Sequence, residues 1–437
     1  MALPWYLHNR VLRSVLIVAA FAGVSAGLVI PFLTLTAQER GVSLAAIGVM
    51  ASSYLVAQML LQLPMGSLSD RVGRVGPLAV GLFVEAVATV GFTFAHSAPS
   101  FILLRSGQGI GVAILYPAFR ALIADITPTN RRGQAYAVVG AAFSGGMLLG
   151  PPIGGVMATI VGVNWLYTTA GLLEVVVAIG TLAYMIRLIP PPSKTLEKVS
   201  VPFRELISRP LAGAFILGFA GQFQFGLFAG IWSIYLKDLG ASDFKIALSF
   251  STFSVTFMLL SPFSGRLADR SERWRRILIA NGVYAVIIAL YGLIAFVPSI
   301  LILSLVEGGI VSFTQPATDA YLASVADPRI QGRVQGAFVT VGMAGAAISA
   351  LLGSVLYGID PVVPFLGGGA VLIALTFVAV YFIRETEHNL KLQPVVVMND
   401  PRQSYVTSDV GLASASDGIG QTPVQAGTRS EGKLGGE

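Results

Sequence analysis

The sequence predicts an all-α membrane protein with twelve transmembrane helices, arranged as two six-helix bundles that are related by an internal repeat. Composition is the first reason for this prediction. The chain has 437 residues, of which 54% are hydrophobic and only 11% are charged, and its mean hydropathy is +0.76. Soluble domains carry about 25% charged residues. Most of the surface of this protein must therefore face lipid instead of water.

The second reason is a series of long apolar stretches between residues 11 and 384. Each approaches the roughly 20 residues that a helix needs to cross a bilayer. The stretches are continuously apolar, whereas the strands of a membrane barrel alternate over about ten residues, so a β-barrel is excluded. We expect helices near residues 12–36, 43–65, 76–96, 100–123, 134–160, 164–188, 211–236, 244–264, 275–297, 299–322, 334–358 and 362–383.

The third reason is a repeat with a fixed offset. The segments Gly66–Arg74 and Gly265–Arg273 are alike, and their aspartates lie 269 − 70 = 199 positions apart. The same offset relates four further pairs, which are Pro117 and Pro316, Gly109 and Gly308, Gly133 and Gly332, and Gly154 and Gly353. One register therefore spans predicted helices two to five and eight to eleven. Duplicated bundles with a site at their interface are a recurring design of transporters.

A polar interruption, Pro190–Pro210, separates six spans from six spans. We therefore expect an N-terminal bundle at 1–189, a cytoplasmic linker at 190–210 and a C-terminal bundle at 211–388. Residues 389–437 are rich in Ser, Gly, Gln, Asp and Thr. They contain too few large apolar groups to offset the entropy of ordering, so we expect a disordered cytoplasmic tail.

The positive charges predict the orientation. On the side of the linker fall Arg10, Arg13, Arg71, Arg74, Arg131, Arg132, Arg266, Arg276, Arg329, Arg333 and Arg384. The opposite side carries only Arg40, Lys237 and Lys245. Because lysine and arginine accumulate in cytoplasmic loops, both termini are predicted to be cytoplasmic in a cell membrane. The same rule explains the net charge of +6, so no nucleic-acid partner is expected. There is no cysteine, and no metal site is expected.

Three segments resemble motifs of the major facilitator superfamily. The first is the Gly66-Ser-Leu-Ser-Asp70-Arg71-Val-Gly73-Arg74 loop, and the second is Arg105-Ser-Gly-Gln108-Gly109-Ile-Gly111 on predicted helix four. The third is Gly146-Met-Leu-Leu-Gly150-Pro151-Pro-Ile-Gly154-Gly155 on helix five, which looks like the antiporter motif of that superfamily. With the twelve spans, the resemblance covers roughly residues 10–385. It is strongest to twelve-span drug:proton antiporters.

The resemblance implies that the first loop is a cytoplasmic lock, which clasps the two bundles when the cavity opens outward. Carried over, Asp70 meets the start of helix eleven, where the positive end of the helix dipole favours an anion, and Arg74 pairs with Asp125. The residues of this lock are Gly66, Asp70, Arg71, Gly73, Arg74 and Asp125, with Asp269, Arg270 and Arg273 as a weaker counterpart in the second half. The alternative is that these charges only set the topology.

The glycines of the helix-five motif permit a second interpretation. Gly146, Gly150 and Gly154 are four residues apart and line one face, and small residues allow membrane helices to pack closely. Pro151 can bend the helix, and Gly155 completes the motif. Packing alone explains these glycines, and the link to export follows from the resemblance only.

Charged residues within the spans are candidates for function, because each costs about 2.5–3.5 kcal/mol at a helix centre. Helical phase places Arg105, Gln108 and Tyr116 on one face of helix four, and Glu307, Gln315 and Asp319 in a polar stripe on helix ten. We expect these six to line a central cavity, with Arg105 tuning the proton affinity of Glu307. A buried structural network is the alternative. Glu85 and Glu174 are expected to be structural or to lie at the lipid interface.

Three functions remain open. The first is a secondary active transporter that exports a small amphipathic compound by proton-coupled alternating access, acting as a monomer with no cofactor and the proton gradient as its energy source. The second is uptake or facilitated transport of a small metabolite. The third is a non-transporting scaffold or sensor. No phosphate-binding loop or nucleophile arrangement indicates an enzyme. Candidates for the substrate path are Tyr54, Gln58, Tyr116, Gln222, Gln224 and Trp232.

One feature departs from the resemblance. Drug:proton antiporters often carry an acidic group in helix one, whereas Ser14–Ala37 has none and Glu39 comes only at its outer end. The resemblance therefore does not place the coupling proton. Glu307 and Asp319 are the substitutes that the sequence offers.

Overall fold

Twelve helices of membrane-spanning length follow one another in the computed structural model, within the described residues 9–128, 131–187, 208–268, 273–326 and 331–392. Apart from the last three residues of the final helix, they lie in one unit, Met1–Asn389. The first six are α2 (Arg10–Glu39), α3 (Leu44–Val72), α4 (Val75–Gly91), α5 (Ala98–Asp125), α6 (Arg132–Ile160) and α7 (Val163–Met185), with a short 3-10 turn η1 (Phe92–Phe94). The second six are α8 (Arg209–Asp238), α9 (Asp243–Ala268), α10 (Arg273–Leu293), α11 (Val297–Val325), α12 (Gln331–Tyr357) and α13 (Val363–Leu392).

Local sequence signals explain where several helices begin and end. The Asn9 side chain accepts hydrogen bonds from the backbone N–H groups of Val11 and Leu12, at 3.0 and 3.1 Å, and so caps α2. Ser97 and Ser100 form a reciprocal cap at the start of α5. Gly73 ends α3 with φ at 94°, a left-handed conformation that glycine adopts without strain.

The twelve spans were predicted correctly, but several helices are longer than expected. The segment Gly66–Val72, predicted to be a loop, forms the last turns of α3, and only Gly73 and Arg74 lie between α3 and α4. Nothing between Gly66 and Gly73 breaks a helix, so α3 continues beyond its apolar stretch. Likewise, α13 continues to Leu392, four residues into the predicted tail. The rest of the tail and residues 188–207 of the linker region lie outside the described residues.

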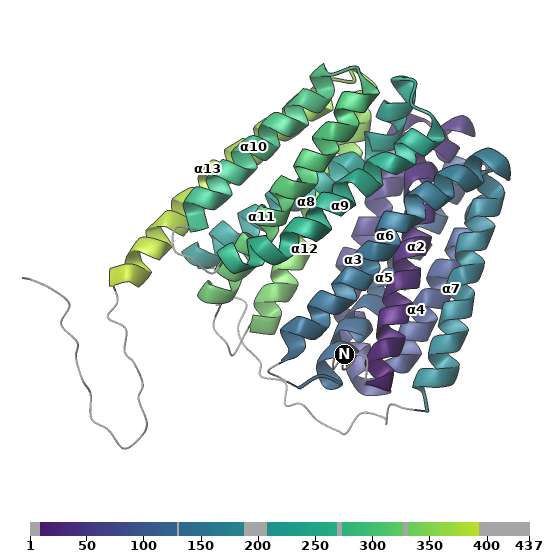
Figure 1. Ribbon diagram of the computed structural model, residues 1–437, viewed down its shortest axis with the longest axis horizontal. Coiled ribbons are helices and arrows are strands. Elements are labelled where there is room, and N and C mark those ends of the chain that lie inside the picture. Colours follow the sequence, from purple (N-terminus) through teal and green to yellow (C-terminus); the bar gives the residue numbers. More distant parts are fainter. Residues whose placement is uncertain (1–8, 129–130, 188–207, 269–272, 327–330, 393–437) are drawn as a thin grey trace, which may run out of the picture. The chain divides into compact units, whose positions relative to one another are not determined.

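The 199-residue repeat reappears in the packing of the helices. A side chain at Gly109 would meet the carbonyl oxygen of Tyr54, and one at Gly308 would meet that of Phe253, 199 positions later. Gly146 and Gly345 approach the backbone at Ala20 and Phe219 in the same register. Each half therefore uses equivalent glycines to pack equivalent helices. Figure 1 shows the two sets of six helices, purple to blue and teal to yellow, as separate groups.

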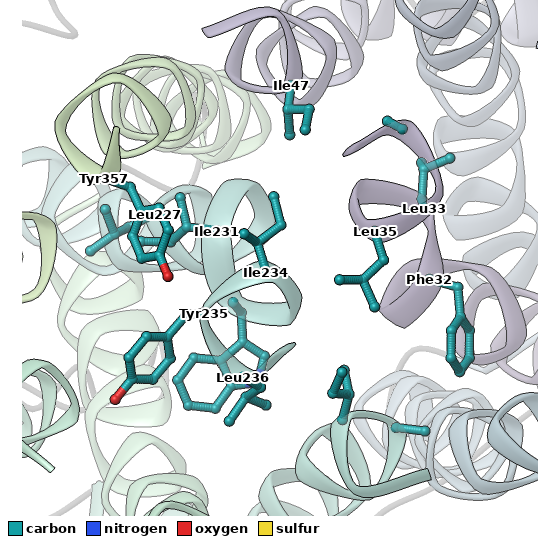
Figure 2. Packing of buried hydrophobic residues seen from close by; sticks show 14 of the residues in the cluster. Phe32, Leu33, Leu35, Ile47, Leu227, Ile231, Ile234, Tyr235, Leu236 and Tyr357 are labelled. Carbon is teal, nitrogen blue, oxygen red and sulfur yellow. The ribbon is translucent and has the colours of Figure 1, made fainter. Parts of the chain in front are cut away.

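We call the face at which α2 begins and α13 ends the inner face, and the opposite one the outer face. Near the outer face, the two halves share one hydrophobic core, in which Phe32 and Leu35 of α2 and Ile47 of α3 belong to the same cluster as Ile231 and Leu236 of α8. Figure 2 shows these side chains coming from both halves. The Ser52 hydroxyl of α3 donates to the carbonyl of Ala347 in α12 at 2.6 Å, and Ser251 of α9 donates to Leu148 of α6 at 2.8 Å. We call this contact zone the outer seam.

Near the inner face the cores are separate. One cluster contains only N-terminal residues, such as Leu12, Leu78 and Leu122. Another contains only C-terminal residues, such as Leu211 and Tyr321. The halves are thus joined through the outer seam and keep independent cores toward the inner face.

Candidate functional site

Polar side chains are exposed on the inner halves of α5 and α11, although both helices have membrane-spanning length. Tyr116 is 40% exposed, and Arg120, Gln315 and Asp319 are also exposed. Polar groups on spanning helices face water or protein rather than lipid. Because the bundles have separate cores at this level, we infer that these side chains border an opening between the inner halves. That Tyr116, Gln315 and Asp319 line one shared cavity stays a prediction.

Arg120 is a member of this group that the sequence analysis missed. Arg120 and Asp319 occupy equivalent positions of the repeat, and the charge of Arg120 acts on Asp319. The ion pairs among the described residues do not include these two. Instead, the Arg120 guanidinium lies 5.8 Å from the ring centre of Tyr116 and 5.2 Å from that of Tyr136. The repeat offset, applied to charged residues, would have found this pair.

Glu307 lies inside the C-terminal bundle. Its side chain is 7% exposed, and its Oε2 accepts a hydrogen bond of 2.7 Å from the Tyr291 hydroxyl of α10. The Tyr284 hydroxyl, also on α10, is a second partner. Tyr291 in turn packs edge-on against Trp232, with ring centres 4.8 Å apart. The described contacts give this carboxylate hydroxyl donors and aromatic walls, but no positive charge.

Arg105 lies inside the N-terminal bundle. Its guanidinium donates to Gln108 Oε1 at 2.6 Å and lies 4.0 Å from the ring centre of Tyr54 on α3. Gln108 is 4% exposed, and its Nε2 donates to Thr89 Oγ1 on α4 at 2.9 Å. Thr89 also contacts Glu174 of α7. In this conformation these side chains are linked in a buried polar network.

The structure does not bring Arg105 and Glu307 together. Gln108 and Glu307 are repeat-equivalent and both point at the neighbouring helix of their own bundle, α4 and α10 respectively. Arg105 follows Gln108 and Tyr54, so the expectation that Arg105 tunes Glu307 across a central cavity is wrong for this conformation. Helical phase shows which residues share a face. It does not show which neighbouring helix that face meets.

The residues predicted to line the substrate path differ in exposure. Tyr116 and Gln222 are exposed, whereas Gln58, Gln224 and Trp232 are buried. Gln224 Nε2 donates to the Gly368 carbonyl at 3.0 Å, and Trp232 Nε1 donates to Ser249 at 2.9 Å. These two side chains connect helices of the C-terminal bundle in the present conformation.

A model of the Major Facilitator Superfamily matches residues 15–232 and 214–398 of the sequence. The chain belongs to the Major Facilitator Superfamily. It is therefore a multi-pass membrane transporter, in agreement with its twelve spanning helices and with the prediction from the three motifs.

Among curated relatives, the quinolone resistance protein NorA of Staphylococcus aureus is 25% identical over 386 residues, which covers 85% of this chain and 95% of NorA. The multidrug resistance protein 1 of Bacillus subtilis is 26% identical over 362 residues, covering 79% of this chain and 89% of that protein. The names of both proteins refer to drug resistance.

Two solved structures share the fold. The human organic anion transporter MFSD10 aligns with a TM-score of 0.64 and 18% identity, covering 87% of this chain and all of that one. A POT family transporter in complex with a thioalcohol conjugated peptide aligns with a TM-score of 0.72 and 14% identity, covering 86% and 96% of the two chains. At these identities the likeness concerns the fold alone.

In this superfamily member, Arg74 contacts two other residues of the predicted lock, Asp70 and Asp125. The guanidinium pairs with Asp125 at 3.0 Å and with Asp70 at 2.5 Å. Burial disfavours its charge, but the hydrogen bonds to both aspartates outweigh this effect and raise the pKa of Arg74 above its usual value. Asp70 remains 61% exposed. Its expected partner is the start of helix eleven, and residues 327–330, which precede that helix, lie outside the described residues. Asp269, Arg270 and the side chain of Arg273 also lie outside the described part of the chain.

Gly66, the first residue of the predicted lock, is not at a close approach of two helices. A Cβ atom there would lie 3.5 Å from Pro117, an ordinary contact distance, so the site has room for a side chain. The helices α3 and α5 approach closely farther out, at Gly109.

The helix-five motif, in contrast, packs tightly. Gly146 and Gly150 place α6 against the backbone of α2, and Gly154 faces Leu28 and Phe32 of the same helix. Gly155 faces Phe244 and Ala247 of α9, in the other bundle. The helix continues through Pro151 without a break. The motif therefore joins α6 to its own bundle on one side and contributes to the outer seam on the other.

We expect Asp70→Asn to favour the inward-open state, because the lock contact of Asp70 would exist only when the inner side closes. An exposed charge contact is worth about 1 kcal/mol or less, so the ratio of the two states should change by about fivefold at most. The natural chain has no cysteine, so a single cysteine can be introduced by Gln315→Cys. This cysteine should react faster with a soluble thiol reagent when Asp70→Asn is also present. Asp360→Asn, on the outer side, is the control. Unchanged labelling and transport would leave the loop as a topology signal.

Proposed function

We propose that this transporter is a proton-coupled exporter of small amphipathic compounds that works by alternating access. The observation that carries the proposal is the buried carboxylate of Glu307, which receives hydroxyl donors but no positive charge from the described side chains around it. A charge in such a place is costly, so the group is suited to binding and releasing a proton during a cycle. NorA and the multidrug resistance protein 1 support the substrate class, by their names.

The described conformation is one of the two states of the cycle. The shared core of the outer seam closes the outer side, and the separate inner cores leave Tyr116, Arg120, Gln315 and Asp319 exposed. In the second state, we propose, the inner halves approach and Arg120 meets Asp319. Both termini lie on the cytoplasmic side in this account, because the basic residues gather at the inner face. The protein acts as a monomer and needs no cofactor.

Flux through proteoliposomes tests the proposal. The purified protein is reconstituted, and the transport of a panel of amphipathic cations, anions and neutral compounds is followed with and without an imposed pH gradient. Efflux that is accelerated by protons moving inward supports the proposal. Uptake that the gradient drives in the same direction as protons favours an importer of a metabolite, and no flux for any compound favours a scaffold or sensor.

A further inference from the structure

The N-terminal bundle contains a buried carboxylate, Glu174, that is separate from Glu307 and the exposed polar residues. Glu174 of α7 is 6% exposed. Ser25 of α2 donates to its Oε1 at 2.5 Å, and Thr89 of α4 lies 3.2 Å from its Oε2. The sequence suggested a structural or lipid-interface group. The structure places this side chain between α2, α4 and α7, in the interior of the bundle, and so excludes the lipid interface.

The charges around Glu174 do not balance if it is ionised. The neighbouring helices bring three other ionisable groups, Glu85 of α4, Arg105 of α5 and Tyr54 of α3, and the polar groups Ser25, Thr89 and Gln108. The charge of Arg105 acts on Glu85 and Tyr54. Arg105 can balance one carboxylate. With two carboxylates and one guanidinium, a second ionised carboxylate would leave an uncompensated charge inside the membrane, which is strongly unfavourable.

The hydrogen bonds around Thr89 can accommodate a proton on Glu174. Thr89 has one hydroxyl proton, but two acceptors compete for it, the Glu85 carbonyl at 2.9 Å and Glu174 Oε2 at 3.2 Å. Its oxygen also accepts from Gln108 Nε2. A proton on Glu174 Oε2 removes this competition. The Glu174 carboxyl then donates to Thr89 Oγ1, while the Thr89 hydroxyl donates to the backbone carbonyl of Glu85. Ser25 continues to donate to Oε1. The Thr89 proton then has a single acceptor, the backbone carbonyl of Glu85.

We propose that Glu174 is a second proton-binding site of the transporter, occupied in the inward-open state and connected to the interface of the two bundles. The connection runs from Glu174 through Thr89 and Gln108 to Arg105, at 3.2, 2.9 and 2.6 Å. Arg105 lies on the ring of Tyr54. Tyr54 packs against a cluster that joins Ala51 and Leu55 of α3 to alanines of α12.

Loss of the proton changes this chain in a defined way. An ionised Glu174 accepts from both Ser25 and Thr89, so the Thr89 proton leaves the Glu85 carbonyl. The Thr89 oxygen is the acceptor for Gln108, and Gln108 Oε1 is the acceptor for Arg105 beside Tyr54, so a reoriented Thr89 hydroxyl passes the change along this chain. Because Tyr54 lies beside the α3–α12 contact, proton release can alter the packing of the two bundles. The inference rests on the proposed function only for its role in transport, since the presence of the proton can be measured separately.

Infrared spectroscopy of the purified protein measures the proton directly. Protonated carboxylic acids have a carbonyl-stretching band that carboxylates lack. At neutral pH, Glu174→Gln should remove one component of this band, because glutamine reproduces the shape and hydrogen bonds of the neutral acid. Glu85→Gln and the exposed Glu39→Gln should leave that component in place. If Glu174→Gln leaves the band unchanged, or if Glu85→Gln removes the component instead, the proposal is wrong.

Two further measurements keep the test decisive. Ser25→Ala, which removes the donor to Oε1, should shift the component in frequency without removing it, and an unshifted band would contradict the assignment. Efflux of ethidium, an amphipathic fluorescent cation, should lose a step of its pH profile in Glu174→Gln but not in Glu39→Gln. A wild-type protein with the infrared component but without gradient-dependent flux would refute the proposed function and leave the proton site intact.

Discussion

Replacement of Glu307 by glutamine should abolish the acceleration of efflux by a pH gradient. The carboxylate is buried against Tyr291 and Tyr284, and glutamine preserves its size and can accept the same hydrogen bonds, but it cannot release a proton. One pH unit supplies about 1.4 kcal/mol for each coupled proton, a factor of about ten in accumulation. We expect wild-type proteoliposomes to show this factor with ethidium and Glu307→Gln to show none.

Binding and coupling should separate in this variant. Ethidium binding to the purified protein should remain close to that of the wild type, because Glu307 lies inside the bundle and not among the exposed residues of the opening. Tyr291→Phe, which removes one donor to the carboxylate, should change the pH at which efflux is half-maximal. Glu39→Gln is the control for carboxylate removal. Gradient-driven accumulation at the wild-type level by Glu307→Gln would make Glu307 structural, and Asp319 would become the leading candidate.

The largest effect on stability is expected at Gly146. A Cβ atom there would lie 2.2 Å from the carbonyl oxygen of Ala20 and 2.6 Å from the backbone nitrogen of Val24. Both are backbone atoms, so α2 and α6 must move apart. We expect Gly146→Ala to lower the free energy of unfolding by about 3 kcal/mol, measured as a lower thermal unfolding temperature in detergent.

The neighbouring glycine is a matched control. Gly145 is on the same helix, and a Cβ atom there has no neighbour within 4 Å. Because alanine is a better helix former than glycine, Gly145→Ala should be neutral or stabilising by up to about 1 kcal/mol. Equal unfolding temperatures for the two variants would show that α2 and α6 do not pack as described.

The helices could be predicted because the signals for them lie in short stretches of sequence. Apolar length located the twelve spans, and polar residues and prolines marked their ends. The predicted ends of α3 and α13 were too early for one reason. A helix can continue into water beyond its apolar stretch. The 199-residue offset, which is a property of sequence alone, relates Gly109 to Gly308, and both lie at close approaches of two helices.

The site was harder to predict, because it depends on which helices are neighbours. Helical phase assigned Tyr116 to one face of one helix and Gln315 and Asp319 to one face of another, and the pairing of Arg74 with Asp125 followed from the resemblance. The same phase suggested a shared cavity for Arg105 and Glu307, which the bundles separate. For Glu174 the sequence left a structural role and the lipid interface open. A peripheral helix still turns one face to its bundle, and Glu174 is on that face, beside Ser25.

Reciprocal cross-linking tests the central claim, that the two bundles alternate between closure at the outer seam and closure at the inner opening. The chain has no cysteine, so introduced pairs react alone. Ser52→Cys with Ala347→Cys reports on the outer seam, where the native side chain and carbonyl are 2.6 Å apart. Arg120→Cys with Asp319→Cys reports on the inner opening. We expect the outer pair to cross-link in the inward-open state and stop transport until it is reduced, and the inner pair to cross-link only during turnover. Undiminished transport with the outer pair cross-linked, or an inner pair that never reacts during turnover, would contradict alternating access.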